Sequence, residues 1–253
     1  MKAIVLAAGM GKRLGNRTVD RPKCMVPLCG RPILEHQARA FRAAGVHDIV
    51  VVRGHAAASV RLDGARIVEN REFATSNILA SLLCAADELC GELLLSYGDI
   101  VFAPDVVALL VAAPGDLCLV VDRDWARVYE GRDAHPIAQA ELCRVEDGRI
   151  LRLGKCVGQD GAHGEFIGLM KASADGAWRL REAGLAVARS YRERQDEPFA
   201  DAPRYRMAYL CDLLQHMADG GERLTPVDIH GRWREIDTPQ DFDRAERDID
   251  WLD

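Results

Sequence analysis

The first thirty-one residues constrain the fold more than any other part of the sequence. They begin with a short apolar run, residues 3–6, of the length and type of a strand buried in a parallel sheet. Small residues follow this run at Ala7, Ala8, Gly9 and Gly11, and they let a backbone approach a ligand closely. A buried strand that leads into a glycine-rich loop predicts an α/β fold with a ligand site at the end of the strand.

Positive charge is concentrated in the same segment. Residues 1–34 contain seven lysines and arginines and a single acid, Asp20, although the whole chain has a net charge of −6. The basic residues are Lys2, Lys12, Arg13, Arg17, Arg21, Lys23 and Arg31. A strand, a glycine-rich loop and clustered cations together predict a polyphosphate site.

The overall composition excludes several classes of protein. With 253 residues the chain is long enough for one large α/β domain, and no apolar run approaches the roughly 20 residues of a membrane span. Its acidic balance argues against nucleic acid as a partner. The cysteines form no CxxC pair and several lie in apolar runs, which favours buried thiols in the cytoplasm.

The pattern of the first half alternates strands with helices. Strands are expected at residues 3–6, 48–52, 66–69, 93–96 and 117–121. Helices are expected from Pro32 to Gly45, from Thr75 or Ser76 to about Leu89, and from Pro104, with a short one at 55–62. This order implies a mostly parallel sheet wound with helices.

The second half has a different pattern. Residues 141–145 and 149–153 flank Asp147-Gly148 and predict a β-hairpin. Further strands are expected at 165–170, 227–229 and 233–236, and helices at 174–194, 205–218 and 239–251. No stretch has the composition of a linker, so residues 1–253 are predicted to form one domain, with a nucleotide-binding half at 1–122. Residues 123–253 would form a lid or acceptor site and the closing helix.

Two common phosphate-binding patterns do not fit the first loop. The Walker pattern GxxxxGK[ST] is absent from the sequence. The dinucleotide pattern GxGxxG fails because Gly9 and Gly11 are followed by Leu14, and the next glycine is Gly15. The second strand also ends in Arg53, where a ribose-binding carboxylate would be expected. A loop whose cations hold the phosphates is the remaining interpretation.

The segments LAAGMGKRLG and RPKCMVPLCGRPIL closely resemble the signature of the nucleotidyltransferases that activate sugar phosphates and small phosphoesters. In that superfamily the signature reads LAAGxGxRL…PKxxxxxxGxPxL, and every fixed position is filled. The resemblance implies a Rossmann-like α/β fold with a mixed, mostly parallel sheet flanked by helices. It implies that Arg13 holds the phosphates and that Lys23 lies beside the phosphorus under attack. The nucleotide-binding residues that it implies are Leu6, Ala7, Ala8, Gly9, Met10, Gly11, Lys12, Arg13, Lys23, Ser76, Asn77, Tyr97, Gly98 and Asp99.

Two aspartates follow predicted strands. Asp99 comes just after residues 93–96, and Asp237 comes after 233–236 and before the last helix. In the resembling enzymes, aspartates at these places hold Mg²⁺, which prefers carboxylates and phosphate oxygens. The alternatives are a strand-end cap for Asp99 and a helix N-cap for Asp237.

The middle of the chain is more similar to the cytidylyltransferases for phosphocholine, 2-aminoethylphosphonate and related phosphonates than to the sugar enzymes. The segments that carry this similarity are LLLSYGDIVF, DRDWARVYEGRDAHPIAQAE, RILRLGK, GEFIGLMKAS and GRWREIDTPQDF. It implies transfer of CMP from CTP to a small phosphonate or phosphomonoester, with release of pyrophosphate. Ser76 and Asn77 match a cytosine-recognising segment, although either could instead cap a helix. Lys155 matches a lysine that reaches the acceptor's phosphate or phosphonate, and its alternative is a solvated strand end.

The candidates for the rest of the acceptor site are Trp125, Tyr129, Glu130, Arg132, His135 and Glu165. Trp125 together with acids would hold an amine or choline head by cation–π and charge contacts. Arg132 and His135 would suit an acceptor with a second anionic group, such as phosphonoformate. The residues alone do not decide between these heads.

Two other functions compete with this interpretation. A sugar-1-phosphate nucleotidylyltransferase would use UTP or dTTP and need a wider acceptor pocket. A non-catalytic nucleotide-sensing subunit of the same fold would commonly lack the lysine or the aspartates that this chain keeps. The resembling enzymes are monomers or homodimers.

Overall fold

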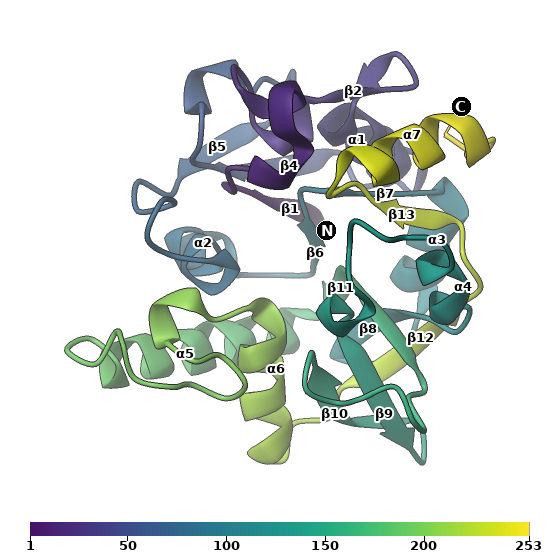
Figure 1. The fold of residues 1–253 in the computed structure, drawn as a ribbon. Coiled ribbons are helices and arrows are strands. Elements are labelled where there is room, and N and C mark those ends of the chain that lie inside the picture. Colours follow the sequence, from purple (N-terminus) through teal and green to yellow (C-terminus); the bar gives the residue numbers. More distant parts are fainter. Residues whose placement is uncertain (253) are drawn as a thin grey trace.

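A computed structural model describes residues 1–252 of the chain. Nine strands form a mixed sheet in the order β10-β9-β11-β6-β1-β4-β5, and β8 joins it through β11 and carries β12 on its other side (Figure 1). The strands of this sheet are β1 (Lys2–Ala7), β4 (Asp48–Arg53), β5 (Arg66–Glu69), β6 (Leu93–Tyr97), β8 (Leu117–Asp122), β9 (Leu142–Glu146), β10 (Arg149–Gly154), β11 (Gly164–Ala172) and β12 (Thr225–Ile229). The α/β fold with a mixed sheet flanked by helices is confirmed.

Seven α-helices surround the sheet in the described residues. They are α1 (Ile33–Ala43), α2 (Ile78–Cys84), α3 (Pro104–Ala112), α4 (Trp125–Tyr129), α5 (Ala174–Ser190), α6 (Leu210–Asp219) and α7 (Pro239–Asp248). Two small ribbons, β2 (Pro27–Leu28) with β3 (Arg31–Pro32) and β7 (Ile100–Phe102) with β13 (Trp233–Glu235), lie outside the main sheet. No helix among these residues is long and apolar enough to cross a membrane.

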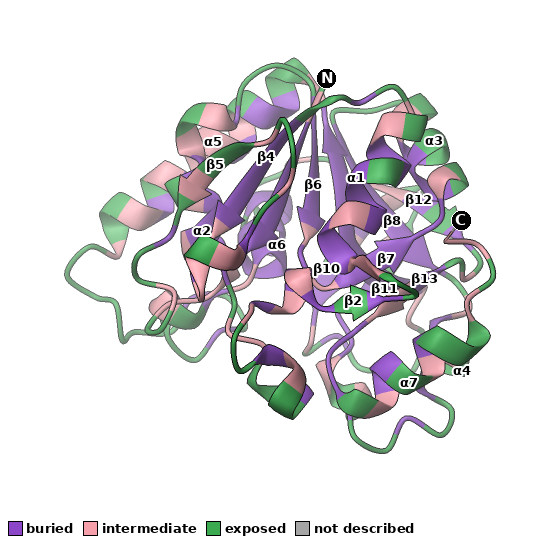
Figure 2. Cartoon of the chain, turned by 90° about the horizontal axis from the view of Figure 1, so that it is seen from above, coloured by how far each residue is buried: buried purple, intermediate pink, exposed green. Residues whose placement is uncertain are grey.

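The central strands are covered on both faces, as the buried, purple strands of Figure 2 show. Successive side chains of β1 point to opposite faces, so Ile4 and Leu6 pack in one core with α2, α5 and α6. Val5 and its neighbours belong to a second core with α1 and α3. This double burial explains why the first strand reads as a continuous apolar run.

The order of the strands differs from a simple parallel series. β4, β1 and β6 are parallel neighbours, and β5 continues them beyond β4. β11 then lies antiparallel between β6 and β8, and at its start it also pairs with β9. The predicted hairpin is present, with positive φ at both Asp147 and Gly148, and it extends the sheet beyond β11. Every antiparallel pair of this sheet therefore includes at least one strand from the second half of the chain.

Several predicted helix boundaries were wrong. The helix expected from Thr75 or Ser76 begins at Ile78, because Thr75 and Ser76 both donate to the carbonyl of Glu72 and close a turn instead. The helix expected to reach residue 194 ends at Ser190, whose carbonyl accepts two bonds from the side chain of Arg194.

Three further helices are also shorter than expected. The segment 205–218 divides into a 3-10 turn at Tyr205–Met207 and α6, and residues 55–62 form only a 3-10 turn at Ala57–Ser59. The closing helix ends at Asp248 instead of residue 251.

The ribbon of β7 and β13 joins the two halves of the chain. The strands are antiparallel, with Glu235 opposite Ile100, and Ile236 donates its amide hydrogen to the carbonyl of Asp99 at 2.8 Å. The end of β13 therefore meets the start of β7. This pairing places Asp99 and Asp237 side by side, although they are far apart in the sequence. α7 packs beside β13 and closes this end of the molecule (Figure 1).

Candidate active site

A cleft of about 350 Å³ opens at the carboxyl ends of β1 and β6. The loop after β1 forms one wall with residues 6–13, and Lys23, Tyr97, Gly98 and Asp99 continue it. The opposite wall contains His135, Gln139, Glu141, Lys155, Glu165, Tyr209, Trp233, Glu235 and Asp237. The cleft thus lies at the sheet edge where open α/β folds bind ligands.

The glycine loop is held close to two neighbouring strand ends. The amide of Gly98 donates to the carbonyl of Leu6 at 2.9 Å, and a Cβ on Gly98 would lie 2.7 Å from that of Ala7. Only glycine fits this approach without a shift of the backbone. Gly9, by contrast, has nothing within 4 Å of an added Cβ, so the backbone at Gly9 is open to a ligand.

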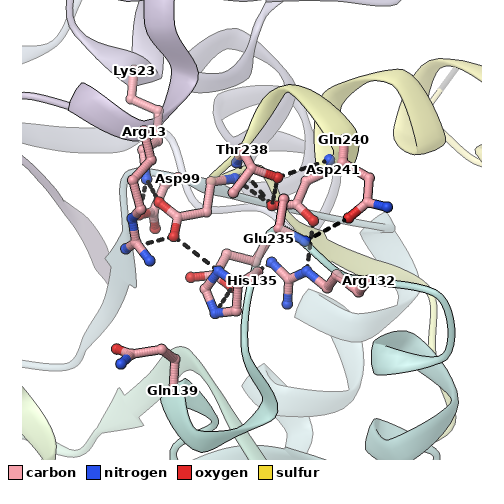
Figure 3. A network of polar contacts seen from close by, with 12 residues as sticks. Arg13, Lys23, Asp99, Arg132, His135, Gln139, Glu235, Thr238, Gln240 and Asp241 are labelled. Carbon is pink, nitrogen blue, oxygen red and sulfur yellow. Dashed lines mark hydrogen bonds and ion pairs between the residues drawn. The ribbon is translucent and has the colours of Figure 1, made fainter.

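Lys23 lies between the two aspartates. Its Nζ donates to Asp99 Oδ2 at 2.9 Å and to Asp237 Oδ1 at 2.5 Å, while Arg13 contacts Asp237 Oδ2 at 2.5 Å (Figure 3). The side chain of Asp237 is 2% exposed and that of Arg13 is 54% exposed. The structure therefore brings together the four residues that the sequence predicted for catalysis.

The charges of this group stabilise one another. Burial alone would lower the pKa of Lys23, but the carboxylates of Asp99 and Asp237 outweigh it and raise that pKa above its usual value. Burial would raise the pKa of Asp237, but the hydrogen bond from His135 and the charge of Lys23 leave it well below the ordinary range. Both side chains are thus charged at neutral pH.

A second ionic network holds the segment after β13. Arg132 donates from Nε to Asp241 Oδ1 at 2.5 Å and from Nη2 to Glu235 Oε2 at 2.8 Å (Figure 3). Asp241 Oδ2 in turn accepts the backbone amide hydrogens of Asp237 and Thr238 and the Thr238 hydroxyl. Arg132 therefore acts on the position of Asp237 through α7, without lining the cleft.

His135 lies beside the same aspartate, on the wall that the two residues share. Its Nδ1 lies 3.0 Å from Asp237 Oδ2, and its Nε2 lies 3.6 Å from Glu235 Oε2. His135, Glu235 and Asp237 offer ligand atoms within 4.8 Å of one another. The carboxylates of Asp99 and Asp237 also converge on one point, now taken by Lys23 Nζ. This set of hard oxygen donors fits a magnesium ion.

Lys155 reaches the cleft from the end of β10. Its Nζ donates to Gln139 Oε1 at 3.1 Å and lies 3.8 Å from the centre of the Tyr209 ring. Burial acts to lower the pKa of Lys155, but the charge of Glu141 outweighs it and the pKa is raised. Lys155 is therefore a cation on the wall opposite Lys23.

Two glutamates of the same wall are buried, and one of them, Glu141, acts on Lys155. Glu141 accepts a hydrogen bond from the Tyr97 hydroxyl at 3.0 Å, and burial raises its pKa to about 7. Glu165 accepts from the Tyr129 hydroxyl through Oε1 at 2.7 Å, and burial raises its pKa to about 8. The strands β9 and β11 set these residues close together, since the amide of Phe166 donates to the carbonyl of Glu141.

The far end of the cleft contains neutral polar side chains. Asn70 Nδ2 donates to Ser81 Oγ at 3.0 Å and to Ser76 Oγ at 3.3 Å, and Asn77 Nδ2 donates to the carbonyl of Met207. Neither Ser76 nor Asn77 caps α2 through its side chain. Both line the cleft, as the nucleotide-binding prediction requires.

The predicted site residues separate into two groups. All fourteen predicted for the nucleotide line the cleft, as do His135, Lys155, Glu165 and Asp237. Trp125, Arg132, Tyr129 and Glu130 do not. Trp125 is instead buried in a small cluster with Tyr129, Ala140, Leu142 and Val157. Its ring is used for packing, so the idea that it faces an acceptor does not fit its position.

Sequence reasoning missed several cleft residues. Glu141 and Tyr209 lay in predicted strand or helix segments, and Asn70 and Gln139 lay in loops without a motif. Glu235 stands two residues before Asp237 on β13. Because side chains two residues apart on a strand point to the same face, the sequence could have placed Glu235 on the same side as Asp237.

A parallel half-sheet, a glycine loop at its edge and lysine between two carboxylates define a nucleotidyltransferase of the α/β class. The chain belongs to the family of the MobA-like NTP transferase domain, whose model matches residues 3–163. Enzymes of this family generally use a divalent metal ion, in keeping with the carboxylates of the cleft.

Curated relatives extend the similarity over almost the whole chain. A protein of Campylobacter jejuni named CTP:phosphoglutamine cytidylyltransferase is 30% identical, covering 96% of this chain and 98% of its own length. A Streptomyces rubellomurinus CMP-5'-(3-aminopropyl)phosphonate synthase is 32% identical over 97% of this chain, which spans only 38% of that protein.

A solved structure supports the fold alone. A CTP:phosphocholine cytidylyltransferase of Streptococcus pneumoniae superposes with a TM-score of 0.74 at 19% identity, covering 97% of each chain.

Proposed function

We propose that the protein transfers CMP from CTP to a small phosphonate or phosphomonoester and releases pyrophosphate. One observation carries the proposal: a single cleft holds the cationic glycine loop, Lys23 between Asp99 and Asp237, and a second cation, Lys155, on the opposite wall. The first group suits a triphosphate, and Lys155 suits the anionic group of an acceptor. The names of the two curated relatives support CTP and a phosphorus-containing acceptor.

The reaction needs little chemistry from the side chains beyond charge and position. An oxygen of the acceptor attacks the α-phosphorus of CTP, and the bond to the departing pyrophosphate breaks in line. Phosphomonoesters have a second pKa of about 6, so the attacking oxygen is already ionised at neutral pH and no general base is required.

Two cations are placed to act on the nucleotide. Lys23 is buried and charged. It would stabilise the negative charge that develops at the phosphorus, and no water would have to reorient when that charge forms. The exposed Arg13 turns from Asp237 toward the outer phosphates when they enter the cleft. Asp99 and Asp237 would hold Mg²⁺, which offsets charge on the leaving pyrophosphate.

The remaining assignments follow from position. Residues 6–13 would contact the nucleotide through their backbone. Ser76 and Asn77 line the far end of the cleft, where they would contact the cytosine base. His135, Lys155 and Glu165 are proposed for the acceptor side. The protein is expected to act in the cytoplasm as a monomer or homodimer, without nucleic acid or a membrane as a partner.

A panel of nucleotides and acceptors tests this function. Purified protein with Mg²⁺ is offered CTP, UTP and dTTP, each with small phosphonates, phosphomonoesters or sugar 1-phosphates, and pyrophosphate is measured. We expect release only from CTP with a phosphonate or phosphomonoester. Release from UTP or dTTP with a sugar 1-phosphate would replace the proposal by a sugar nucleotidylyltransferase. Nucleotide binding without any release would indicate a sensing subunit.

A further inference from the structure

Two of the acceptor heads considered from the sequence do not fit the wall opposite the glycine loop. A quaternary ammonium needs an open aromatic face, but Trp125 is buried outside the cleft lining and the ring of Tyr209 is already covered by Lys155. Trp233 lines the cleft but is only 2% exposed, and its Nε1 donates to Asp122. A carboxylate head needs an available cation. Arg132 is paired with Asp241 and Glu235 outside the cleft lining, and His135 lies against Asp237.

The buried carboxyl of Glu165 offers a different contact. Glu165 lines the cleft and is 5% exposed, and its Oε1 accepts from Tyr129. Its second oxygen, Oε2, is buried and has no hydrogen-bond partner. A buried carboxyl oxygen without a partner is costly whether or not it carries a proton, so such an atom in a ligand cleft indicates that the ligand supplies the partner.

The surrounding charges favour a cationic donor. Glu235 and Asp122 act on Glu165 with the same sign as burial, and Arg132 and the hydrogen bond from Tyr129 only partly oppose them. A positive group placed here would favour the charged form of Glu165, offset the negative charge of Glu235 and Asp122, and fill the missing bond.

From these contacts, and resting on the proposed function, we propose that the acceptor carries a primary ammonium group and that Glu165 binds it through Oε2. Lys155 would then hold the phosphonate or phosphate of the same molecule. The substrate class is therefore an aminoalkyl phosphonate or phosphate whose nitrogen still carries hydrogens.

Matched acceptors test this assignment. 2-Aminoethylphosphonate is compared with propylphosphonate, which replaces the ammonium by a methyl group, and with 3-phosphonopropanoate, which replaces it by a carboxylate. Phosphoethanolamine is compared with phosphocholine, whose nitrogen has no hydrogen. We expect kcat/KM for pyrophosphate release with CTP to favour each primary amine by at least about tenfold, as for one charge-assisted hydrogen bond.

A variant connects the preference to the residue. Glu165→Gln keeps an oxygen for Tyr129 but cannot carry a negative charge, so the ratio of amine to alkyl turnover should fall at least about fivefold. Glu146→Gln, at an exposed glutamate of β9 outside the cleft lining, is the control and should keep the full ratio. Equal use of propylphosphonate, a preference for the carboxylate, or an unchanged ratio in Glu165→Gln would overturn the assignment.

Binding separates this assignment from the proposed function. Calorimetric titrations use the same phosphonates with protein saturated by the α,β-methylene analogue of CTP. If no acceptor supports release but 2-aminoethylphosphonate binds at least about tenfold more tightly than propylphosphonate, the proposed function fails and the ammonium site stands. If the two bind equally, or neither binds, the ammonium site fails as well.

Discussion

The glycine loop and the wall opposite it hold their cations in different ways. Arg13 on the loop keeps 54% of its side chain exposed although it contacts Asp237, whereas the side chain of Arg132 behind the opposite wall is 2% exposed and is paired with two acids. We propose that the exposed cation changes partner when a phosphate enters the cleft. The buried one holds the segment around Asp237 in place through Asp241. Charge near this cleft would then serve ligand binding on one wall and the shape of the site on the other.

The largest expected effect comes from variants of Lys23 and Asp99, which lie at the centre of the site between the two walls. Lys23→Ala and Asp99→Ala should each lower kcat for pyrophosphate release by about 10³-fold, because each removes a preorganised charge beside the reacting phosphates. Steady-state assays with CTP and the best acceptor measure the loss. Asp63→Ala, at an exposed loop aspartate, is the control. Near-normal turnover in either folded variant would contradict the catalytic assignment.

The next effect separates buried from exposed arginines. Arg132→Met should lower the free energy of unfolding by about 3–5 kcal/mol, because it leaves the carboxylate of Asp241 buried without its partner. Arg123→Met breaks a pair with Asp228 that is 39% exposed on both sides and should cost less than about 1 kcal/mol. Urea unfolding monitored by circular dichroism gives both values. Equal losses of unfolding free energy in the two variants would show that the buried and the exposed ion pairs contribute equally to stability.

A pair of glycine variants sharpens the comparison within the loop wall. Gly98→Ala should destabilise the protein by about 1–3 kcal/mol, because its Cβ would lie 2.7 Å from the Cβ and 2.8 Å from the Cα of Ala7. Gly9→Ala meets nothing within 4 Å and should leave the melting temperature unchanged, while it raises the KM for CTP. Thermal unfolding and nucleotide kinetics distinguish the two. A normal KM in Gly9→Ala would show that the ligand does not approach that backbone.

The last expected effect depends on pH and concerns the acidic side of the opposite wall. Burial raises the pKa of Glu165 to about 8, above its value in the unfolded chain, so the folded state binds the extra proton and loses stability as the pH rises from about 5 to 8. Glu165→Gln removes this dependence. Its stability relative to the natural protein should therefore increase by up to about 1.4 kcal/mol per pH unit over that range. Melting curves at several pH values, with ligand absent, measure the gap, and a gap independent of pH would contradict the prediction.

The sequence predicted the loop wall well because that wall is local. Gly9, Gly11 and Lys23 lie within one short motif, and the strand before them is apolar on both faces. The opposite wall depends on pairings between distant segments. That β11 would enter between β6 and β8, and that Arg132 would meet Asp241 of α7, follows from tertiary packing that no local pattern records. The same applies to Trp125, whose aromatic character is equally suited to a ligand site and to a buried cluster.

The ribbon of β7 and β13 has a consequence for the growing chain. The family model matches only residues 3–163, yet Asp237 is positioned by β13 and α7, well beyond that segment of the chain. During translation the glycine loop, Lys23 and Asp99 leave the ribosome long before Asp237 does. A nascent chain would thus possess the nucleotide wall but lack the second carboxylate, and competence for the proposed transfer would arise only after β13 and α7 had been synthesised.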